Sequence, residues 1–555
     1  MPVEQQAGFN GLTALAVDPT PTRAMPVADR PAPARDHPSD AARRPHDLAR
    51  VRTLPWPLLV IVTVQAALSL RLVWSNTAFQ DEALYLWAGR LEWAHWLHGA
   101  PTPVFATWFS GTPVIYPPLA ALAGAVGGLA AARSLSLIFM LTATTLLWGT
   151  TSRLFGKRAA LFAAALFATL ANTQFLGAFA TYDPMALMLI ALATWLAVRS
   201  ISPGPRPQMT LLIAAASALA LADATKYAAT LFDPVVLIVV ILAGRRLRGW
   251  RASLTAGLIM SGALLTLLAG GLAVGGSAYW HGITSTTLNR PAASSPTSVI
   301  LERSYVWTSL VIVLSALGII LARQDGRIVR TLIATLALTD LLVPAEQVRV
   351  HTIVSLQKHV DFGAWFAVIA AGYAMARISR VNRGTGWAPV LALPIVACTA
   401  FSAVGQAASL YRVWPNAASL ISAIRPVLKH SNGRVLAEGD EFSVIPYYLG
   451  NDVSFRQLST TYLFTYVDPR THRRIGMPAS FADAIRHGYF RFVVLDYAGG
   501  HPAVDRVITQ AAQTSGNCRE ILNEPYVQLY VRLTFRVWKC TRPSGHSERK
   551  HHVAG

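Results

Sequence analysis

The chain has 555 residues, of which 53% are hydrophobic and only 14% are charged, and its mean hydropathy is +0.40. A soluble globular protein carries about 25% charged residues, so this composition excludes a disordered or nucleic-acid-binding protein and argues against an ordinary soluble enzyme. Lys and Arg nevertheless outnumber Asp and Glu by 48 to 28, for a formal net charge of +20. A basic excess on an apolar chain indicates charge sorted across a bilayer. The sequence therefore predicts a polytopic membrane protein with room for one soluble domain.

The first 54 residues are rich in Pro, Ala and Arg and show no apolar periodicity, so we expect a disordered tail there. A secretory signal would place its apolar core much nearer the first residue. The first apolar run, residues 55–74, follows a cluster of arginines, which holds the N-terminus in the cytoplasm by the positive-inside rule. These arginines are Arg43, Arg44, Arg50 and Arg52.

Eleven apolar runs are predicted to cross the bilayer, which requires about 17–25 residues per helix. They are residues 55–74, 133–151, 158–178, 184–199, 209–226, 229–244, 252–274, 304–322, 329–345, 361–377 and 387–408. An odd number of crossings places the C-terminus outside, on a multi-pass protein of the plasma membrane. Residues 117–131 are apolar but short and Gly-rich, and we expect a juxtamembrane or re-entrant segment there, on the outer side.

The distribution of basic residues tests this layout. The predicted cytoplasmic loops hold most of the Arg and Lys of the membrane region. These residues are Arg153, Lys157 and Arg158; Arg199 and Arg206; Arg245, Arg246, Arg248 and Arg251; Arg323, Arg327 and Arg330; and Arg377, Arg380 and Arg383. If residues 117–131 formed a true crossing, every later loop would change sides and these clusters would fall outside. The charge bias argues against that alternative.

After about residue 410 the chain changes to short alternating segments that are typical of a small α/β domain. Strands are predicted at 433–437 and 489–497, helices at 479–487 and 502–515, and a pair of strands within 520–540. This domain, residues 411–545, is expected outside the membrane, and a short basic disordered tail, residues 546–555, follows it. Cys518 and Cys540 lie near the ends of the last stretch, where a disulfide and two unpaired thiols are equally open.

Three carboxylates lie next to apolar runs on the predicted outer side: two follow the first run, and one precedes the run at 184–199. Asp81 and Glu82 are adjacent, and such a pair can supply a base and a metal ligand or hydrogen-bond partner. Acids that favour the N-terminal dipole of a helix would explain them equally well. Asp183 precedes Pro184 at the start of another run, which fits a helix N-cap. Because a capping carboxylate can still face a cavity, Asp183 also remains a candidate.

Cationic side chains gather at the same predicted level. Lys226 and Tyr227 end one apolar run, and Lys358 and His359 precede another. A lysine there suits a phosphate group, whereas anchoring or snorkelling at the membrane interface is the structural alternative. Further candidates in the outer loops are His281, Arg290, Glu346 and Arg349. The sequence contains no Gly-rich phosphate loop, Cys/His metal spacing or nucleophile elbow that we can recognise.

Five short motifs occur in an order that resembles a known family. They are Gln80–Tyr85 (QDEALY), Tyr116–Leu119 (YPPL), Arg153–Arg158 (RLFGKR), Tyr182–Pro184 (YDP) and Thr225–Tyr227 (TKY). In this order they resemble the integral-membrane glycosyltransferases of the C superfamily (GT-C), in the branch of the protein O-mannosyltransferases and aminoarabinose transferases, glycosyltransferase family 39-like. The resemblance covers about residues 55–410. Relatives usually have a histidine where this chain has Tyr116, so no role of that histidine carries over.

The resemblance implies the GT-C fold, an α-helical polytopic membrane domain, followed here by the outer α/β domain. It also implies a hexosyl- or pentosyltransferase that takes a sugar from a polyprenyl-phosphate carrier on the outer face of the membrane. Asp81 carries over as the catalytic base. Glu82 would be its supporting partner, and Asp183 the second acid of the site.

These residue types allow a mechanism to be written as a hypothesis. Asp81 takes the proton from an acceptor hydroxyl, of a lipid, a glycan or a protein, in an inverting displacement. The leaving phosphate needs its charge stabilised, and cationic side chains could do this without any cofactor. A divalent metal at Asp81 and Glu82 stays open. The candidates for phosphate binding are Lys226, Arg349, Lys358 and His359, and those for lining the cleft include Tyr85, Tyr116, Tyr182 and Tyr227.

Two other classes of protein stay open at this point. Acids and lysines at membrane depth also bind or relay ions in transporters and lipid flippases, although we find no convincing internal repeat or interrupted mid-membrane helices in the sequence. A binding or assembly protein that keeps the fold without the activity is the third alternative. The expected partners are the lipid-linked donor, the acceptor and membrane lipids, and no nucleic acid.

Overall fold

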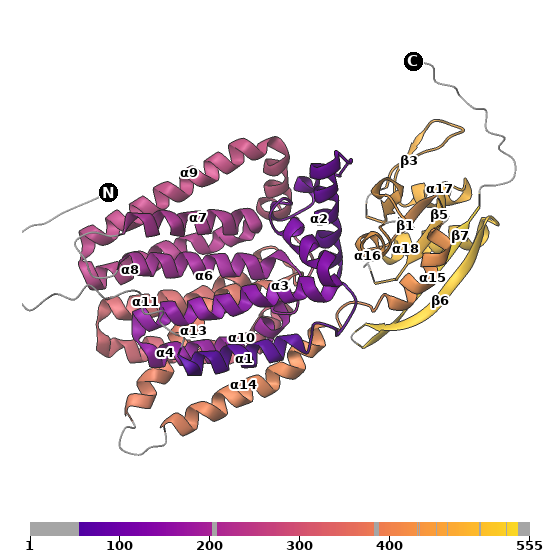
Figure 1. Cartoon of the computed structure of the whole chain (residues 1–555). Helices are drawn as coiled ribbons and strands as arrows, with labels where there is room; N and C mark the ends of the chain where they lie inside the picture. Colours follow the sequence, from indigo (N-terminus) through magenta and orange to yellow (C-terminus); the bar gives the residue numbers. More distant parts are fainter. Residues whose placement is uncertain are drawn as a thin grey trace, which may run out of the picture. The chain divides into compact units, whose positions relative to one another are not determined.

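The computed structural model describes residues 55–201, 208–381, 388–429, 431, 433–450, 452–462, 464–498, 501–528 and 530–541. The predicted tails, residues 1–54 and 546–555, lie outside the described residues. The described residues belong to one compact unit. Its long helices and its C-terminal sheet are labelled in Figure 1.

The helical region runs from α1 to α14. Its α-helices are α1 (Trp56–Leu70), α2 (Gln80–His98), α3 (Tyr116–Phe155), α4 (Lys157–Thr169), α5 (Ala171–Leu176), α6 (Tyr182–Ser200), α7 (Met209–Thr225), α8 (Asp233–Arg248), α9 (Trp250–Ile283), α10 (Thr297–Leu321), α11 (Arg327–Leu338), α12 (Leu342–Arg349), α13 (Leu356–Val381) and α14 (Ala388–Leu410). The short turns η1 (Phe105–Thr107), η2 (Tyr227–Phe232), η3 (Thr284–Leu288), η4 (Ala322–Asp325) and η5 (Thr339–Leu341) lie between some of them.

Within the described residues, seven helical stretches are long and apolar enough to cross a membrane, and several shorter apolar helices accompany them. Each of the eleven predicted crossings coincides with a helix or with a helix that a short break interrupts. The prediction of a polytopic α-helical membrane protein is therefore confirmed.

The segment predicted to lie at the membrane surface, residues 117–131, is helical and forms the first part of α3. Gly127 and Gly128 break the helix within this segment, and Gly128 has φ 62° and ψ −151°. A residue without a Cβ adopts such angles at little steric cost. The first part of α3 packs tightly on α2, since a Cβ on Gly89 would lie 2.0 Å from the Pro117 carbonyl oxygen. The glycines noted in the sequence thus interrupt α3 before the predicted crossing, residues 133–151, begins.

The predicted crossing 158–178 is also interrupted. It consists of α4 and α5, which are separated at Leu170, where the backbone is extended. A break inside an apolar environment leaves backbone groups that need partners. Here the Gln174 side chain donates to the Thr169 carbonyl oxygen at 2.9 Å. A polar residue in an apolar run therefore compensates for the interrupted helix.

The basic loops that we predict to be cytoplasmic contact one another at one end of the helices. Arg246 at the end of α8 donates to the Leu154 carbonyl oxygen at 3.0 Å. Arg248 donates to the Ile201 carbonyl oxygen at 3.1 Å. These contacts join loops that the charge bias had already placed on one side. The assignment of that side to the cytoplasm rests on the charge bias itself.

The C-terminal region alternates helices and strands. Its elements are α15 (Ala418–Leu428), β1 (Arg434–Ala437), α16 (Glu441–Leu449), η6 (Phe455–Gln457), β2 (Leu458–Thr460), β3 (Tyr466–Val467), β4 (Arg474–Ile475), α17 (Ala479–Arg486), β5 (Phe490–Leu495), α18 (Pro502–Thr514), β6 (Cys518–Gln528) and β7 (Val531–Cys540). Five strands form a sheet in the order β2-β1-β5-β7-β6, and β3 and β4 form a separate hairpin. The pairs of β1 with β2 and β5 are parallel, whereas β7 pairs antiparallel with β5 and β6.

Both faces of this sheet are covered, which explains why β5 reads as an almost continuous apolar run. Val493 and Leu495 belong to a core that α17 and α18 complete, with Phe481 and Ile508 among its members. Phe492, on the opposite face of β5, belongs to the large core that also includes buried residues of α15 and α16. Successive side chains of β5 thus pack against helices on opposite faces of the sheet.

The predicted C-terminal elements are confirmed, including the strand pair, and the small sheet domain is present. Of the two alternatives for the cysteines, the structure has the disulfide between Cys518 and Cys540. The sequence reading did not predict α15 and α16. Both contain an internal proline, Pro426 and Pro446 respectively, and proline normally argues against a helix.

Candidate active site

Two lysine–carboxylate pairs form the centre of the candidate site. Lys358 pairs with Asp81, and Lys226 Nζ lies 2.5 Å from Asp183 Oδ1. His359 adds its Nε2, which is 3.7 Å from the same Asp183 oxygen. The Lys358–Asp81 pair joins residues 277 positions apart in the chain. The structure therefore brings together five residues that the sequence analysis had selected from separate motifs.

Helix ends position these side chains. Asp81 and Asp183 lie in the first turns of α2 and α6, Lys226 follows the last residue of α7, and Lys358 and His359 begin α13. Polar groups are easiest to accommodate where a helix ends, because backbone groups there already need polar partners. The charged side chains of the candidate site therefore lie together at the end of the helical region that is opposite the basic loops.

Asp183 was expected to be an N-cap, and this expectation is wrong. The cap position of α6 is Thr181, and Asp183 lies inside the first turn. Its Oδ2 accepts a hydrogen bond of 2.9 Å from the Thr181 hydroxyl, while Oδ1 faces Lys226. Both oxygens are thus committed to side chains.

The accessibility of the four charged groups differs. The side chains of Lys226 and Lys358 are each 5% exposed, and Asp183 is fully buried, whereas the Asp81 side chain is 25% exposed. Lys226 is therefore held inside the protein, and the snorkelling alternative for this lysine is wrong. Asp81 is the carboxylate of the cluster that a molecule from outside can reach.

Tyrosine rings form one wall of this cluster. Lys226 Nζ lies 4.8 Å from the centre of the Tyr182 ring. That ring is 4.6 Å from Tyr85, and Tyr116 meets both rings at nearly right angles. The Tyr182 hydroxyl is hydrogen-bonded to the Ser110 side chain, a contact that the sequence did not suggest. Three of the four predicted tyrosines thus pack together beside the lysine.

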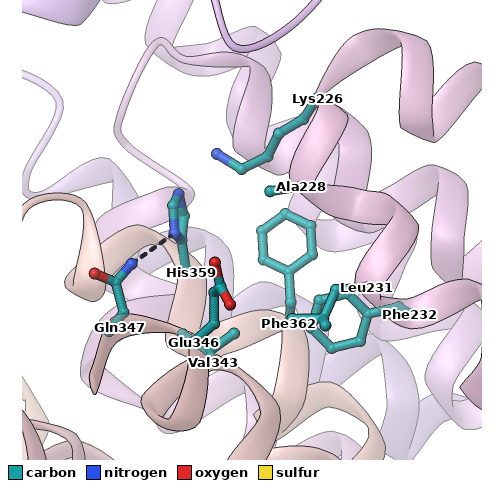
Figure 2. Close-up of a pocket in the computed structure, with 9 residues that line it drawn as sticks. All are labelled: Lys226, Ala228, Leu231, Phe232, Val343, Glu346, Gln347, His359 and Phe362. Atoms are coloured by element: carbon teal, nitrogen blue, oxygen red, sulfur yellow. Dashed lines mark hydrogen bonds between the residues drawn. The ribbon is translucent and has the colours of Figure 1, made fainter. Parts of the chain in front are cut away.

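A pocket opens next to Lys226 and His359, between η2, α12 and α13 (Figure 2). Its polar side chains are Lys226, Glu346, Gln347 and His359, and the rest of the lining is apolar. The apolar residues are Ala228, Leu231, Phe232, Val343 and Phe362. Gln347 is 3.3 Å from His359 Nδ1, and Figure 2 shows the lysine amine and the imidazole on the same side of the pocket. A polar entrance beside apolar walls suits an anionic head group on an apolar chain.

The remaining candidates are more peripheral. Arg349 forms an ion pair of 2.6 Å with Glu346, and these side chains are 56% and 40% exposed. Arg349 is thus engaged at the surface, although its partner lines the pocket. Arg290 is among the cations around His359. His281 is exposed near the end of α9, and Tyr227 is buried and donates its backbone N–H to the Ser110 carbonyl oxygen.

Glu82, the expected supporting partner of Asp81, does not face the cluster. It is fully buried, and Arg133 donates to its two oxygens at 2.8 and 2.7 Å. The backbone N–H groups of Phe79 and Ala180 donate to the same oxygens at 3.0 and 2.8 Å. Glu82 therefore fixes the backbone before Asp81 to the backbone before Asp183.

Arg133, the partner of Glu82, was not among the residues selected from the sequence. It is fully buried and also donates to the carbonyl oxygens of Val73, Asn76 and Thr77, at 2.7, 3.0 and 3.3 Å. Its signal was present in the sequence, since an arginine at the start of an apolar run needs a partner. The sequence did not show that this partner is Glu82.

A second group of carboxylates lies in the C-terminal domain, where β1 and β5 end. Glu438, Glu441 and Asp496 are buried there. Burial, with a contribution from Asp496, raises the pKa of Glu438. Burial also raises the pKa of Asp440 to about 7, with Asp496 and Asp81 adding to the effect. This acidic edge of the sheet was not predicted, since each acid follows an unremarkable short strand or turn in the sequence.

Comparison with known proteins bears on the fold that holds this site. Residues 113–269 match the family model described as dolichyl-phosphate-mannose-protein mannosyltransferase. This match includes Tyr116, Asp183 and Lys226 and ends before Lys358. Among curated proteins, no sequence matches significantly.

Solved structures resemble the chain over most of its length. One is ArnT from Cupriavidus metallidurans bound to undecaprenyl phosphate, with a TM-score of 0.53 and 14% identity, covering 86% of this chain and 97% of that one. Another is the oligosaccharyltransferase AglB from Archaeoglobus fulgidus with an inhibitory peptide and a dolichol-phosphate, with a TM-score of 0.52 and 11% identity, covering 89% and 75%. The chain thus has the GT-C fold of membrane-embedded glycosyltransferases, and its residues 113–269 match the protein mannosyltransferase family within that superfamily.

Proposed function

We propose that this protein transfers a sugar from a polyprenyl-phosphate-linked donor to an acceptor hydroxyl at the outer face of the plasma membrane. In this proposal the N-terminus is cytoplasmic and the C-terminal domain lies outside. The observation that carries it is the difference between the two carboxylates of the site. Asp183 is fully buried and paired with Lys226, while Asp81 is partly accessible and paired with Lys358. The fold, the family match and the lipid phosphates in the two similar structures support the same assignment.

The pocket beside Lys226 is the proposed place for the donor phosphate. Lys226 and His359 supply positive charge or hydrogen-bond donors, and Phe232 and Phe362 offer apolar surface to the first part of a lipid chain. In the structure Lys226 pairs with Asp183, so a bound phosphate would share the lysine with that carboxylate. A leaving phosphate stabilised in this way needs no protonation before the bond breaks.

Asp81 is the proposed general base. It takes the proton of the acceptor hydroxyl as that oxygen bonds to the anomeric carbon. The bond from the anomeric carbon to the phosphate oxygen breaks, and the phosphate leaves with the electron pair, which inverts the configuration. Lys358 pairs with the base and holds it in position.

A divalent metal shared by Asp81 and Glu82 does not fit this arrangement. Both oxygens of Glu82 already accept hydrogen bonds from Arg133 and from backbone N–H groups. A metal on Glu82 would have to displace these donors and separate the backbone segments that they join. A similar structure, the Archaeoglobus fulgidus oligosaccharyltransferase, is described in complex with zinc and sulfate. The mechanism proposed for this chain routes no step through a metal.

Sugar transfer in proteoliposomes tests the proposal. Purified protein with a radiolabelled polyprenyl-phosphate sugar and a hydroxyl acceptor should release polyprenyl phosphate and label the acceptor. Movement of the intact donor across the bilayer without bond cleavage would identify a flippase instead. Donor binding with neither reaction, across a panel of lipid, glycan and peptide acceptors, would favour a protein that keeps the fold as a binding module.

The phosphate-binding role of Lys226 gives a separate prediction. The double variant Asp183→Asn/Lys226→Gln removes both charges of the buried pair and so avoids an isolated buried charge. Because a hydrogen bond to a charged group contributes about 1.5–3 kcal/mol, we expect the KM for the donor to rise about 10- to 100-fold. Initial rates at varied donor concentration measure this. The exposed Lys429→Gln is the matched control, and an unchanged KM in the double variant would show that the phosphate binds elsewhere.

A further inference from the structure

Three potential metal ligands lie together in the C-terminal domain, in residues that the proposed transfer reaction does not use. Asp468 follows β3, Asp483 is on α17, and His487 is the residue after that helix. One ligand atom of each residue lies within 4.8 Å of the other two. The strand β3 and the helix α17 are labelled in Figure 1.

Local hydrogen bonds hold two of these side chains in place. Asp468 accepts from the Arg470 backbone N–H at 2.9 Å and from the Thr471 hydroxyl at 2.6 Å, which fixes the carboxylate within its turn. The His487 ring lies nearly parallel to the Tyr466 ring, with centroids 6.4 Å apart. Its Nδ1 is 3.0 Å from the Asp483 carbonyl oxygen. The contact with Tyr466 holds the imidazole in place, and a metal at Nδ1 would replace the proton that this nitrogen shares with the carbonyl oxygen.

The third side chain, Asp483, faces the imidazole of His487. Asp483 Oδ2 is shielded from solvent, and within the described residues it accepts no hydrogen bond of good geometry. It lies 3.2 Å from His487 Nδ1. A buried carboxylate oxygen normally accepts a hydrogen bond, and this one has only the imidazole beside it, an arrangement that a metal ion bound by both groups would explain. A simple ion pair between protonated His487 and Asp483 is the competing explanation.

We propose that Asp468, Asp483 and His487 bind a zinc ion. Two carboxylates and a neutral imidazole carry a charge of −2, which a divalent cation neutralises. Calcium and magnesium prefer oxygen ligands alone, whereas zinc accepts nitrogen and carboxylate oxygen together. Bonds of about 2.1 Å in a tetrahedral site place ligand atoms about 3.4 Å apart, close to the Asp483–His487 distance. The fourth position would hold water.

The zinc ion would join the β3–β4 hairpin to α17. The hairpin has only two residue pairs in its ladder, and its tip carries the exposed Arg470 and Arg473. A metal bond from Asp468 to the end of α17 would fix this cationic tip on the domain. The role is structural, and it is independent of the proposed sugar transfer.

Zinc binding to the full-length protein in detergent tests this site. The protein is stripped with a chelator and titrated with zinc chloride against a chromophoric competitor. The chain contains 14 histidines, so each result is compared with the matched variant His472→Asn. His472 is exposed on the same hairpin at φ 55°, a conformation that asparagine tolerates. Wild type and His472→Asn should bind one zinc ion with the same affinity.

The variants Asp483→Asn and His487→Gln should each bind zinc at least 10-fold more weakly. Thermal unfolding of the stripped proteins establishes that the variants are folded, and added zinc should raise the midpoint of wild type and of His472→Asn alone. Equal affinity in all four proteins, or an equal loss in His472→Asn, would mean adventitious binding only and would overturn the proposal. A midpoint that responds to pH but not to zinc would assign the cluster to a His–Asp ion pair.

Discussion

Asp81→Asn is expected to lower the turnover of sugar transfer by about 10²–10⁴-fold, because general-base assistance contributes a factor of that size. Asparagine has nearly the same shape as aspartate and can still accept a hydrogen bond from Lys358, but it cannot take the proton of the acceptor. The donor phosphate is proposed to bind beside Lys226, so the KM for the donor should change little. Single-turnover transfer from a labelled donor, measured in proteoliposomes, separates these two quantities.

Two comparisons make the result specific to Asp81. Glu302→Gln changes an exposed acid on α10 and should retain wild-type turnover. Asp183→Asn leaves Lys226 without its charged partner, so it should alter donor affinity and stability as well as turnover. If Asp81→Asn retained most of the wild-type turnover, with normal folding, the base would have to be another residue.

Arg133→Met is expected to destabilise the protein by about 3–5 kcal/mol, which is the usual cost of removing one partner from a buried ion pair. Glu82 would keep its negative charge in a fully buried position, and the carbonyl oxygens of Val73 and Asn76 would lose the hydrogen bonds from Arg133. The double variant Glu82→Gln/Arg133→Met removes the stranded charge and should recover a large part of this loss. Denaturant unfolding in detergent, followed by tryptophan fluorescence, measures the difference.

The control for this series is Arg303→Met, which removes an exposed arginine on α10. Its free energy of unfolding should stay within about 0.5 kcal/mol of wild type, as is usual for exposed positions. A similarly small change in Arg133→Met would contradict the role of the Glu82–Arg133 pair. Because this pair fixes the backbone before Asp81 and Asp183, the variant should also lose transfer activity in the fraction that remains folded.

The helical layout could be read from the sequence because its causes are local. A bilayer requires long apolar runs, and the bias of Arg and Lys orients them. The loops selected by charge alone do contact one another, as Arg246 and Leu154 show. Interruptions such as the one at Leu170 were missed, because they depend on whether a side chain such as Gln174 can satisfy the broken backbone.

The C-terminal domain was predicted unevenly for a similar reason. β5 and the strands that end at Cys540 follow from alternating or continuous apolar patterns. The helices α15 and α16 contain prolines, and the contacts of their apolar faces decide their structure. The disulfide between Cys518 and Cys540 stayed open until the register of β6 and β7 placed the two cysteines opposite each other.

The sequence by itself determined the class of protein, the resemblance to the GT-C family and the identity of the acids and cations at the helix ends. Those inferences need only composition, run length and motif order. Only the tertiary structure decided that Asp81 pairs with Lys358, that Asp183 pairs with Lys226, and that Glu82 turns away to Arg133. The reason is physical. A charge buried at membrane depth must find a partner, and which partner it finds depends on how helices far apart in the sequence pack.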